Sequence, residues 1–135
     1  MTTIESKKVN ISADRLDVVA FLKNMNNIEK LLPQGKYSEW KSTNESCSFK
    51  IQNAYTIVLD FMSEEADGTI IYKSGGGSPF AFTLTSHVND VAGNSEGYMV
   101  CDADINPFLK MVVQGPLKNL FDYMAERLVV QFASN

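Results

Sequence analysis

The middle of the chain alternates apolar and polar side chains through one short segment after another, and this alternation constrains the fold most. It is clearest in residues 47–52, 55–62, 80–87 and 98–105. Every second residue of a strand points to the same face of its sheet, so a period of two predicts β-strands. With a weaker segment at 37–42 and a strand that begins near residue 70, we expect about six consecutive strands.

Short connections join these segments, which favours an antiparallel meander. The tightest connection is Asp67-Gly68, a dipeptide typical of a turn between neighbouring strands. One face of the predicted sheet is aromatic and aliphatic, whereas the other is rich in threonine, lysine and aspartate. A sheet of this kind needs another element to cover its apolar face.

The last segment of the chain has the pattern of such a cover. Asn106 is a good helix N-cap, and Pro107 would take the first helical position, where its missing N–H is harmless. Polar residues then recur every four positions along residues 110–126, which predicts an amphipathic helix of about six turns. Gly115-Pro116 falls inside this helix, and we expect a kink there because proline removes a backbone hydrogen bond.

The start of the chain is expected to form one strand and two short helices. Residues 2–11 alternate as a strand with one mostly polar face. Ser12 is the predicted N-cap of the first helix, with Asp14 in its first turn, where a carboxylate favours the helix dipole. The second helix, residues 28–32, should end before Pro33, because the residue preceding a proline avoids the helical region.

Length and composition favour a single domain over residues 1–135. The chain is 44% hydrophobic and 21% charged, and at this length it buries roughly two-thirds of its unfolded surface without a metal or a disulfide as a staple. No apolar run approaches the roughly 18 residues of a membrane span. The polar N-terminus lacks the apolar core of a signal peptide, and Cys47 and Cys101 fit free buried thiols, so a cytoplasmic protein is expected.

The charge distribution argues against nucleic acid as a partner. The formal net charge is −4, and residues 60–104 contain eight acids against one base, Lys73. Arg15 and Arg127 are the two arginines of the sequence. A nucleic-acid-binding protein needs clustered lysine and arginine to displace counterions from phosphate. DNA, RNA and anionic membrane surfaces are therefore not expected as partners.

Five stretches and the order of the elements carry a resemblance to a known family. The stretches are residues 18–22 (VVAFL), 31–33 (LLP), 46–49 (SCSF), 78–80 (SPF) and 104–107 (DINP). Together with the order strand, two short helices, about six strands and one long helix, they resemble the START-like, or SRPBCC, superfamily. Its members include lipid-transfer domains, the birch pollen allergen and polyketide aromatase/cyclases. The resemblance is closest to small stand-alone bacterial members and to the G-type accessory proteins of carbon monoxide dehydrogenase.

This resemblance implies an α+β helix-grip fold, in which an antiparallel curved sheet of about seven strands wraps around the long C-terminal helix and two short helices follow strand 1. It also implies a hydrophobic cavity between that helix and the sheet, in which some members bind lipids, sterols, hormones or polyketides. The same apolar pattern equally fits a filled core. The expected cavity residues are Phe49, Tyr55, Ile57, Leu59, Phe61, Phe80, Phe82, Leu84, Met99 and Cys101 from the sheet, and Leu109, Val113, Leu117 and Met124 from the helix.

No catalytic residue, metal site or cofactor is predicted. His87, the single histidine, alternates with the apolar positions of its strand and is expected on the surface. Asp102 and Asp104 point to one side of a strand, where carboxylates are ordinarily solvated. The glycine-rich segment 75–79 lacks the Lys-Ser/Thr and the following helix of a phosphate-binding loop. Tyr55 would face the cavity, where its hydroxyl either orients a ligand or bonds to an ordinary protein group.

Three functions remain as alternatives. The preferred one is non-enzymatic binding or transport of a small apolar molecule, such as a lipid, an isoprenoid or an aromatic compound. The second is a cyclase- or hydrolase-type enzyme that uses Tyr55, Asp60 or His87 inside the cavity. The third is an interaction module with a filled core, like the carbon monoxide dehydrogenase accessory proteins, which docks on a protein partner or forms a homodimer. The cavity entrance is expected between residues 25–33, residues 75–79 and the first turns of the last helix.

Overall fold

The computed structural model describes residues 2–51 and 55–133. Over these residues the chain forms eight strands, two α-helices and one 3₁₀ helix, η1. In chain order the elements are β1 (Thr2–Glu5), β2 (Val9–Ile11), α1 (Arg15–Lys23), η1 (Met25–Leu31), β3 (Tyr37–Ser42), β4 (Ser46–Ile51), β5 (Tyr55–Glu64), β6 (Ile70–Ser74), β7 (Ala81–Val91), β8 (Asn94–Asp104) and α2 (Pro107–Gln131).

The strands of the described part form one antiparallel sheet of eight strands. Its order is β1-β8-β7-β6-β5-β4-β3, and β2 also pairs with β8. Strands β3 to β8 follow one another as a meander, which confirms the prediction from the short connections. The first strands of the chain extend the β8 edge, so that β1 and β3 lie at opposite ends of the sheet.

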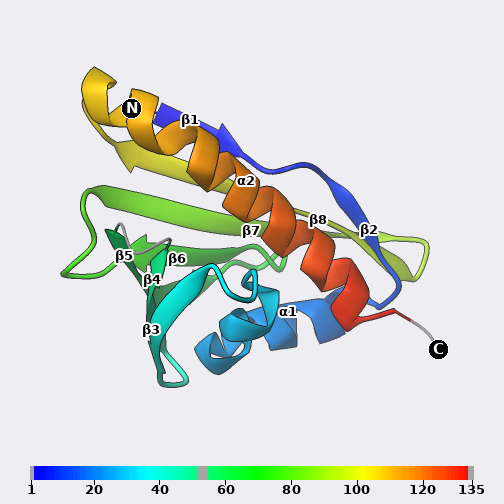
Figure 1. The fold of residues 1–135 in the computed structure, drawn as a ribbon. Helices are drawn as coiled ribbons and strands as arrows, with labels where there is room; N and C mark the ends of the chain where they lie inside the picture. Colours follow the sequence, from blue (N-terminus) through cyan, green and yellow to red (C-terminus); the bar gives the residue numbers. More distant parts are fainter. Residues whose placement is uncertain (1, 52–54, 134–135) are drawn as a thin grey trace.

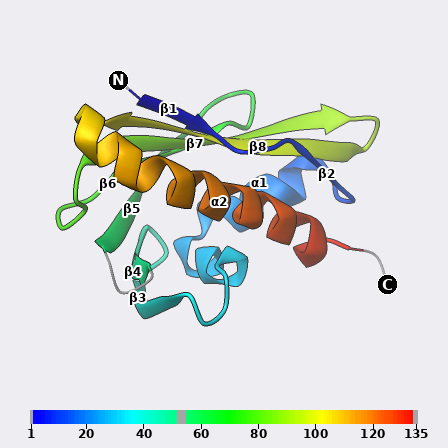
Figure 2. The same cartoon turned by 45° about the horizontal axis from the view of Figure 1, so that its top comes forward.

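The three helices cover one face of this sheet. Helix α2 runs across it, and α1 and η1 lie beside the C-terminal half of α2 (Figures 1 and 2). Tyr72 of β6 is fully buried, and its hydroxyl donates to the carbonyl oxygen of Leu22 in α1 at 2.8 Å, which fastens α1 to the sheet. This arrangement is the helix-grip fold of the α+β class, as the sequence predicted.

The first strand differs from its prediction. The expected strand over residues 2–11 is divided into β1 and β2, because the chain turns inward at Ser6. The backbone N–H of Ser6 donates to the Met99 carbonyl oxygen at 2.8 Å, and the Ser6 hydroxyl accepts from the Met99 N–H at 2.8 Å. The next residue, Lys7, donates its backbone N–H to Oδ1 of Asp122 in α2 at 2.7 Å. The break therefore ties this edge of the sheet to α2.

Two of the predicted helix ends are confirmed and two are wrong, since η1 begins at Met25 and not at residue 28. Asn106 caps α2, since its side chain accepts from the Leu109 N–H at 2.8 Å. Helix η1 ends before Pro33, and Leu32 is extended as a residue before proline should be. The N-cap of α1 is Asp14, not Ser12, because the Asp14 carboxylate reaches the backbone N–H three residues on.

Helix α2 continues through Pro116 to Gln131 without a break. The proline therefore does not end the helix, and the kink stays a prediction. A second local irregularity lies in β5, where the register shifts between Phe61 and Ser63. Phe61, directly before this bulge, is half-buried, and Met62, within it, is exposed.

Candidate ligand-binding site

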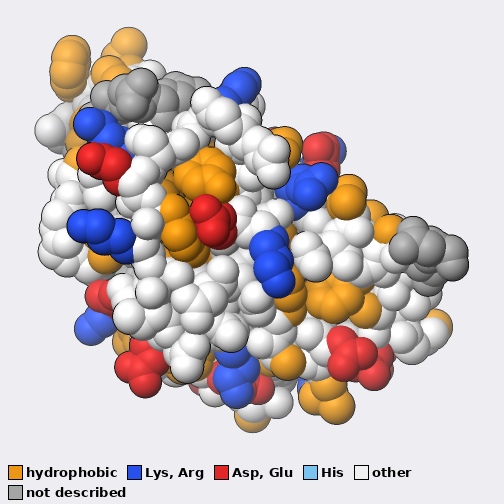
Figure 3. Space-filling view, turned by 60° about the horizontal axis from the view of Figure 1, so that its bottom comes forward, with side chains coloured by type: hydrophobic (Ala, Val, Ile, Leu, Met, Phe, Trp, Pro, Cys, Tyr) orange, Lys and Arg blue, Asp and Glu red, His pale blue; other side chains and the backbone are white. Residues whose placement is uncertain are grey.

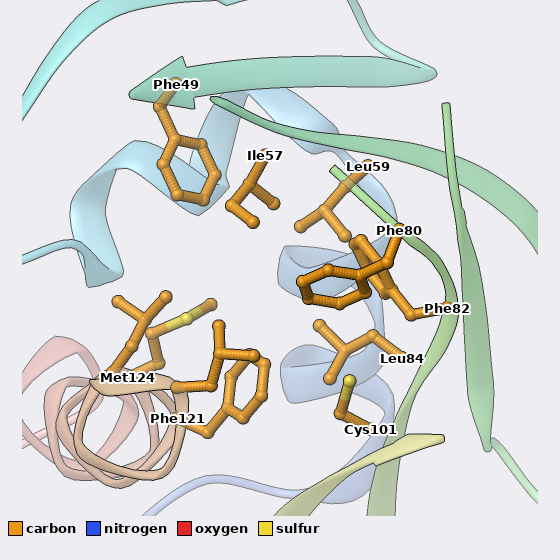
Figure 4. A pocket seen from close by; sticks show the side chains of 11 residues that line it. Phe49, Ile57, Leu59, Phe80, Phe82, Leu84, Cys101, Phe121 and Met124 are labelled. Carbon is orange, nitrogen blue, oxygen red and sulfur yellow. The ribbon is translucent and has the colours of Figure 1, made fainter. Parts of the chain in front are cut away.

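An apolar slot lies between α2 and the concave face of the sheet. We call it the inner slot. Figure 4 shows side chains from the sheet and from α2 pointing toward one another around it. The helical members recur at positions i, i+3, i+4 and i+7, which places them on one stripe of α2. The lining residues are Phe49, Ile57, Leu59, Phe80, Phe82, Leu84, Cys101, Leu117, Leu120, Phe121 and Met124.

Most of the residues expected from the sequence line this slot. The structure brings together Phe49, Ile57, Leu59, Phe80, Phe82, Leu84, Cys101, Leu117 and Met124. Sequence reasoning missed Leu120 and Phe121, although their spacing from Leu117 gave a signal, since positions i+3 and i+4 share a helix face.

Five expected residues lie elsewhere. Met99 and Val113 are buried in the core without lining the inner slot. Phe61 is half-buried at the bulge of β5, and Leu109 is half-buried in the first turn of α2. Tyr55 is half-buried at the start of β5, and burial raises the pKa of its hydroxyl.

The inner slot is nearly filled by its own side chains. The space open to the centre of a water-sized sphere is about 10 Å³, which is roughly the room for one water molecule. In this conformation the interior therefore has the packing of a filled core. A larger ligand would enter only if side chains or α2 moved.

The chemistry of the slot is apolar throughout. Its single titratable group is the Cys101 thiol, and burial together with the nearby Asp102 raises the pKa of that thiol to about 12. Burial likewise raises the pKa of Cys47 to about 12. Both thiols stay protonated at neutral pH and are poor nucleophiles and poor metal ligands.

Two surface grooves lie along α2 near the inner slot. The mouth groove, about 390 Å³, shares Leu120 with the slot. The polar groove, about 480 Å³, shares Tyr123 with the mouth groove. Figure 3 views the molecule from below and shows hydrophobic side chains in a hollow with charged side chains around it. The mouth groove is lined by Pro33, Lys36, Ile51, Gly115, Pro116, Asn119, Leu120 and Tyr123, and the polar groove by Glu29, Lys30, Leu32, Gln34, Tyr123, Arg127 and Gln131.

The mouth groove overlaps the expected entrance only at Pro33. The glycine-rich segment 75–79 instead folds against the outer face of β5. There the Gly75 N–H donates to the Val58 carbonyl oxygen at 3.0 Å, and the Ser78 hydroxyl accepts from the Val58 N–H at 3.0 Å. A Cβ at Gly75 would lie 2.5 Å from the Val58 side chain, so this close approach requires glycine.

The residues considered for acid–base chemistry are not brought together. His87 stacks on Tyr98 with ring centroids 4.7 Å apart, on the face of the sheet opposite the helices. Asp60 is also on that face and accepts from the Ser46 hydroxyl at 2.6 Å. Tyr55 falls on the inner face, in step with Ile57.

The paired aspartates of β8 have separate surroundings. Asp102 accepts from the Thr3 hydroxyl at 2.7 Å, and Asp104 is exposed. Within residues 2–51 and 55–133, no three histidine, cysteine or acidic side chains are grouped as a metal site would require.

Comparisons with known proteins support the fold and leave the function open. The sequence matches no family model and no curated protein. An uncharacterized protein from Bacillus thuringiensis is 12% identical, with a TM-score of 0.74 over 98% of this chain and 100% of that chain. The XoxI protein from Bacillus cereus is 13% identical, with a TM-score of 0.76 over 98% of this chain and 96% of that one.

Truncated norcoclaurine synthase from Thalictrum flavum is 11% identical, with a TM-score of 0.75 over 99% of this chain and 94% of that chain. The chain shares the fold of all three. At such low identities the likeness extends to the fold alone, since one fold hosts many activities. Among the described helices, none is both long and apolar enough to cross a membrane.

Proposed function

We propose that this protein is a START-like carrier or sensor that binds a small apolar molecule between α2 and the sheet, without chemistry of its own. One observation carries the proposal: the inner slot is lined wholly by apolar side chains and one protonated thiol. Leu120 lines both the inner slot and the mouth groove, so displacement of this side chain would connect the slot with solvent. The buried free thiols Cys47 and Cys101 support a reducing, cytoplasmic location.

Binding in the slot requires it to widen. Leu117, Leu120 and Met124 lie on one stripe of α2, so a small outward shift of that helix would open the slot along its length. Met124 can also change rotamer at low cost, because its side chain is unbranched and flexible. A ligand then recovers the free energy of burying apolar area, at about 25 cal/mol per Å².

A thermal-shift experiment tests the proposal. Full-length protein stripped of bound lipid is heated with aliphatic alcohols, isoprenoid alcohols or naphthalene. At one hundred times Kd, a ligand adds about 2.7 kcal/mol, which raises Tm on the order of 10 °C. A library in which no compound shifts Tm would contradict the proposal.

Two tryptophan variants locate the site. Leu120→Trp places an indole where the inner slot meets the mouth groove, and it should abolish the shift while far-UV circular dichroism stays unchanged. Val130→Trp, on an exposed position of the same helix, is the matched control and should keep the shift. Equal responses of the two variants would place the ligand elsewhere.

A second function is favoured by an exposed apolar surface at the start of α2. Phe108, Met111 and Val112 are 77%, 84% and 54% exposed, and their spacing places them on one side of the first two turns. A filled interior beside such a surface fits an interaction module, including a homodimer. Light scattering after size-exclusion chromatography tests it: a dimer that Phe108→Ser dissociates supports this function, and a monomer at all concentrations excludes the homodimer.

A further inference from the structure

The mouth groove and the polar groove are neighbours along α2 that share Tyr123, and the lining becomes more polar and basic from the first groove to the second. Asn119, Tyr123 and Arg127 are spaced by four residues, so they form a single stripe that faces both grooves. At the inner end, Leu120 and Pro116 present apolar surface. At the outer end, the stripe reaches Arg127 in the polar groove.

More cationic than acidic side chains line the two grooves. Lys36 lines the mouth groove, and Lys30 and Arg127 line the polar groove. Glu29 is the acid of the two grooves, and the Tyr37 hydroxyl donates to its Oε2 at 3.0 Å. This locally basic end contrasts with a formal net charge of −4 for the chain.

These cations are also free to bind a ligand. The ion pairs between described residues engage Lys7, Lys23 and Lys118, so Lys30, Lys36 and Arg127 are unpaired there. Lys30 is held with its Nζ 5.9 Å from the centre of the Phe21 ring. Arg127 is half-buried, which lowers the screening of its charge by water.

We infer that the ligand is an amphipathic carboxylate, with its apolar body in the mouth groove, its chain end at Leu120 beside the inner slot, and its carboxylate on Arg127. A guanidinium presents a planar fork that fits a carboxylate with two parallel hydrogen bonds. Seven residues of helix separate Leu120 from Arg127, about 10 Å along α2, close to the length of an extended medium-chain acyl group. This inference rests on the proposed function and adds the head group that the protein selects.

Three probes with the same alkyl chain test it by calorimetry on the full-length protein at neutral pH: decanoate, decanol and decylammonium. Decanoate should bind most tightly and decylammonium most weakly. Arg127→Gln should lower the affinity for decanoate about tenfold, which corresponds to the loss of one charge-assisted hydrogen bond. It should leave the affinity for decanol unchanged. Lys110→Gln makes the same charge change on the same helix, outside the grooves, and should alter neither affinity.

The outcomes distinguish a failure of the carboxylate inference from a failure of the proposed function. Equal binding of decanoate and decanol, or decanoate binding that Arg127→Gln does not change, overturns the carboxylate inference while the proposed function stands. If none of the three probes binds under conditions where the protein is folded, the result counts against both the carboxylate inference and the proposed function. Added salt should weaken the binding of decanoate but not that of decanol. A salt effect of equal size on both affinities would also overturn the inference.

Discussion

At the scale of single residues, two buried serines differ in what their hydroxyls bond to. Ser86 and Ser95 are each 1% exposed. The Ser95 hydroxyl donates to the Ala13 carbonyl oxygen at 2.7 Å. Among the described residues the Ser86 hydroxyl has no hydrogen-bond partner, and the nearby Tyr72 hydroxyl donates to Leu22 instead.

This difference predicts opposite effects of the same substitution. Ser86→Ala removes an unpaired buried hydroxyl and should raise the free energy of unfolding by about 1 kcal/mol. Ser95→Ala removes a partly buried hydrogen bond to the Ala13 carbonyl oxygen and should lower it by about 1 kcal/mol. Urea denaturation measures both. Destabilisation by Ser86→Ala would mean that this hydroxyl bonds to Tyr72 or to a buried water.

The turn between β7 and β8 stores backbone strain at one residue. Val91 pairs with Asn94, and the two residues between them, Ala92 and Gly93, have φ values of 51° and 89°. This is a two-residue hairpin turn whose conformation favours Asn-Gly, because an alanine side chain clashes with its own backbone there.

Ala92→Asn should therefore stabilise the protein by about 0.5–1 kcal/mol. Gly93→Ala should destabilise it through the backbone alone, since a Cβ at that position meets no atom within 4 Å. Differential scanning calorimetry of both variants measures whether each one gains or loses stability. A loss of stability in Ala92→Asn would contradict the strain argument.

At the scale of elements, α2 is held to the first strands by Asp122. Desolvation alone would raise the pKa of this carboxyl, but the hydrogen bonds from the Lys118 ammonium and the Lys7 N–H lower it below its ordinary value. A carboxyl whose pKa is lowered by folding stabilises the folded protein at pH values above its unfolded pKa of 3.8. This contribution is lost as the pH falls through the lower pKa of the folded protein.

Asp122→Asn should therefore cost about 1 kcal/mol near neutral pH, after allowance for partial exposure. The difference from the wild type should shrink as the pH falls below about 4. Urea denaturation across the acid range measures this. A difference that stays constant with pH would show that the carboxylate charge does not stabilise the contact.

The sequence predicted elements better than it predicted their irregularities. Alternation located the strands, and Asn106-Pro107 located the start of α2, because both signals depend on neighbouring residues. The break at Ser6 was not predictable, since it is decided by hydrogen bonds to Met99, far away in the chain. The bulge after Phe61 was missed for the same reason.

The candidate site shows a second limit of periodicity. A period indicates which side chains face inward, and nine of the expected residues do line the inner slot. It does not indicate how closely α2 approaches the sheet. That distance depends on how all the facing side chains pack, so whether the interior is open or filled required the structure.

At the scale of the whole molecule, the two cysteines provide reporters at separate positions across one sheet. Cys47 is on β4, next to the edge strand β3, and Cys101 is on β8, next to β1. Both thiols are buried, and burial raises each pKa to about 12, so neither is a thiolate at pH values near 8. Alkylation of either one therefore requires the structure to open, and for Cys101, which lines the inner slot, a shift of α2 is one such opening.

If the molecule unfolds as one cooperative unit, the two thiols should be alkylated at the same rate in native buffer. Mass spectrometry after iodoacetamide treatment measures the two rates in one sample. An apolar ligand in the inner slot should slow both rates equally, because it stabilises the folded state as a whole. Faster labelling of Cys47 would show instead that the β3–β4 edge opens on its own, and this edge includes Phe49 and borders the mouth groove at Ile51. That opening would offer the ligand an entry to the inner slot besides a shift of α2.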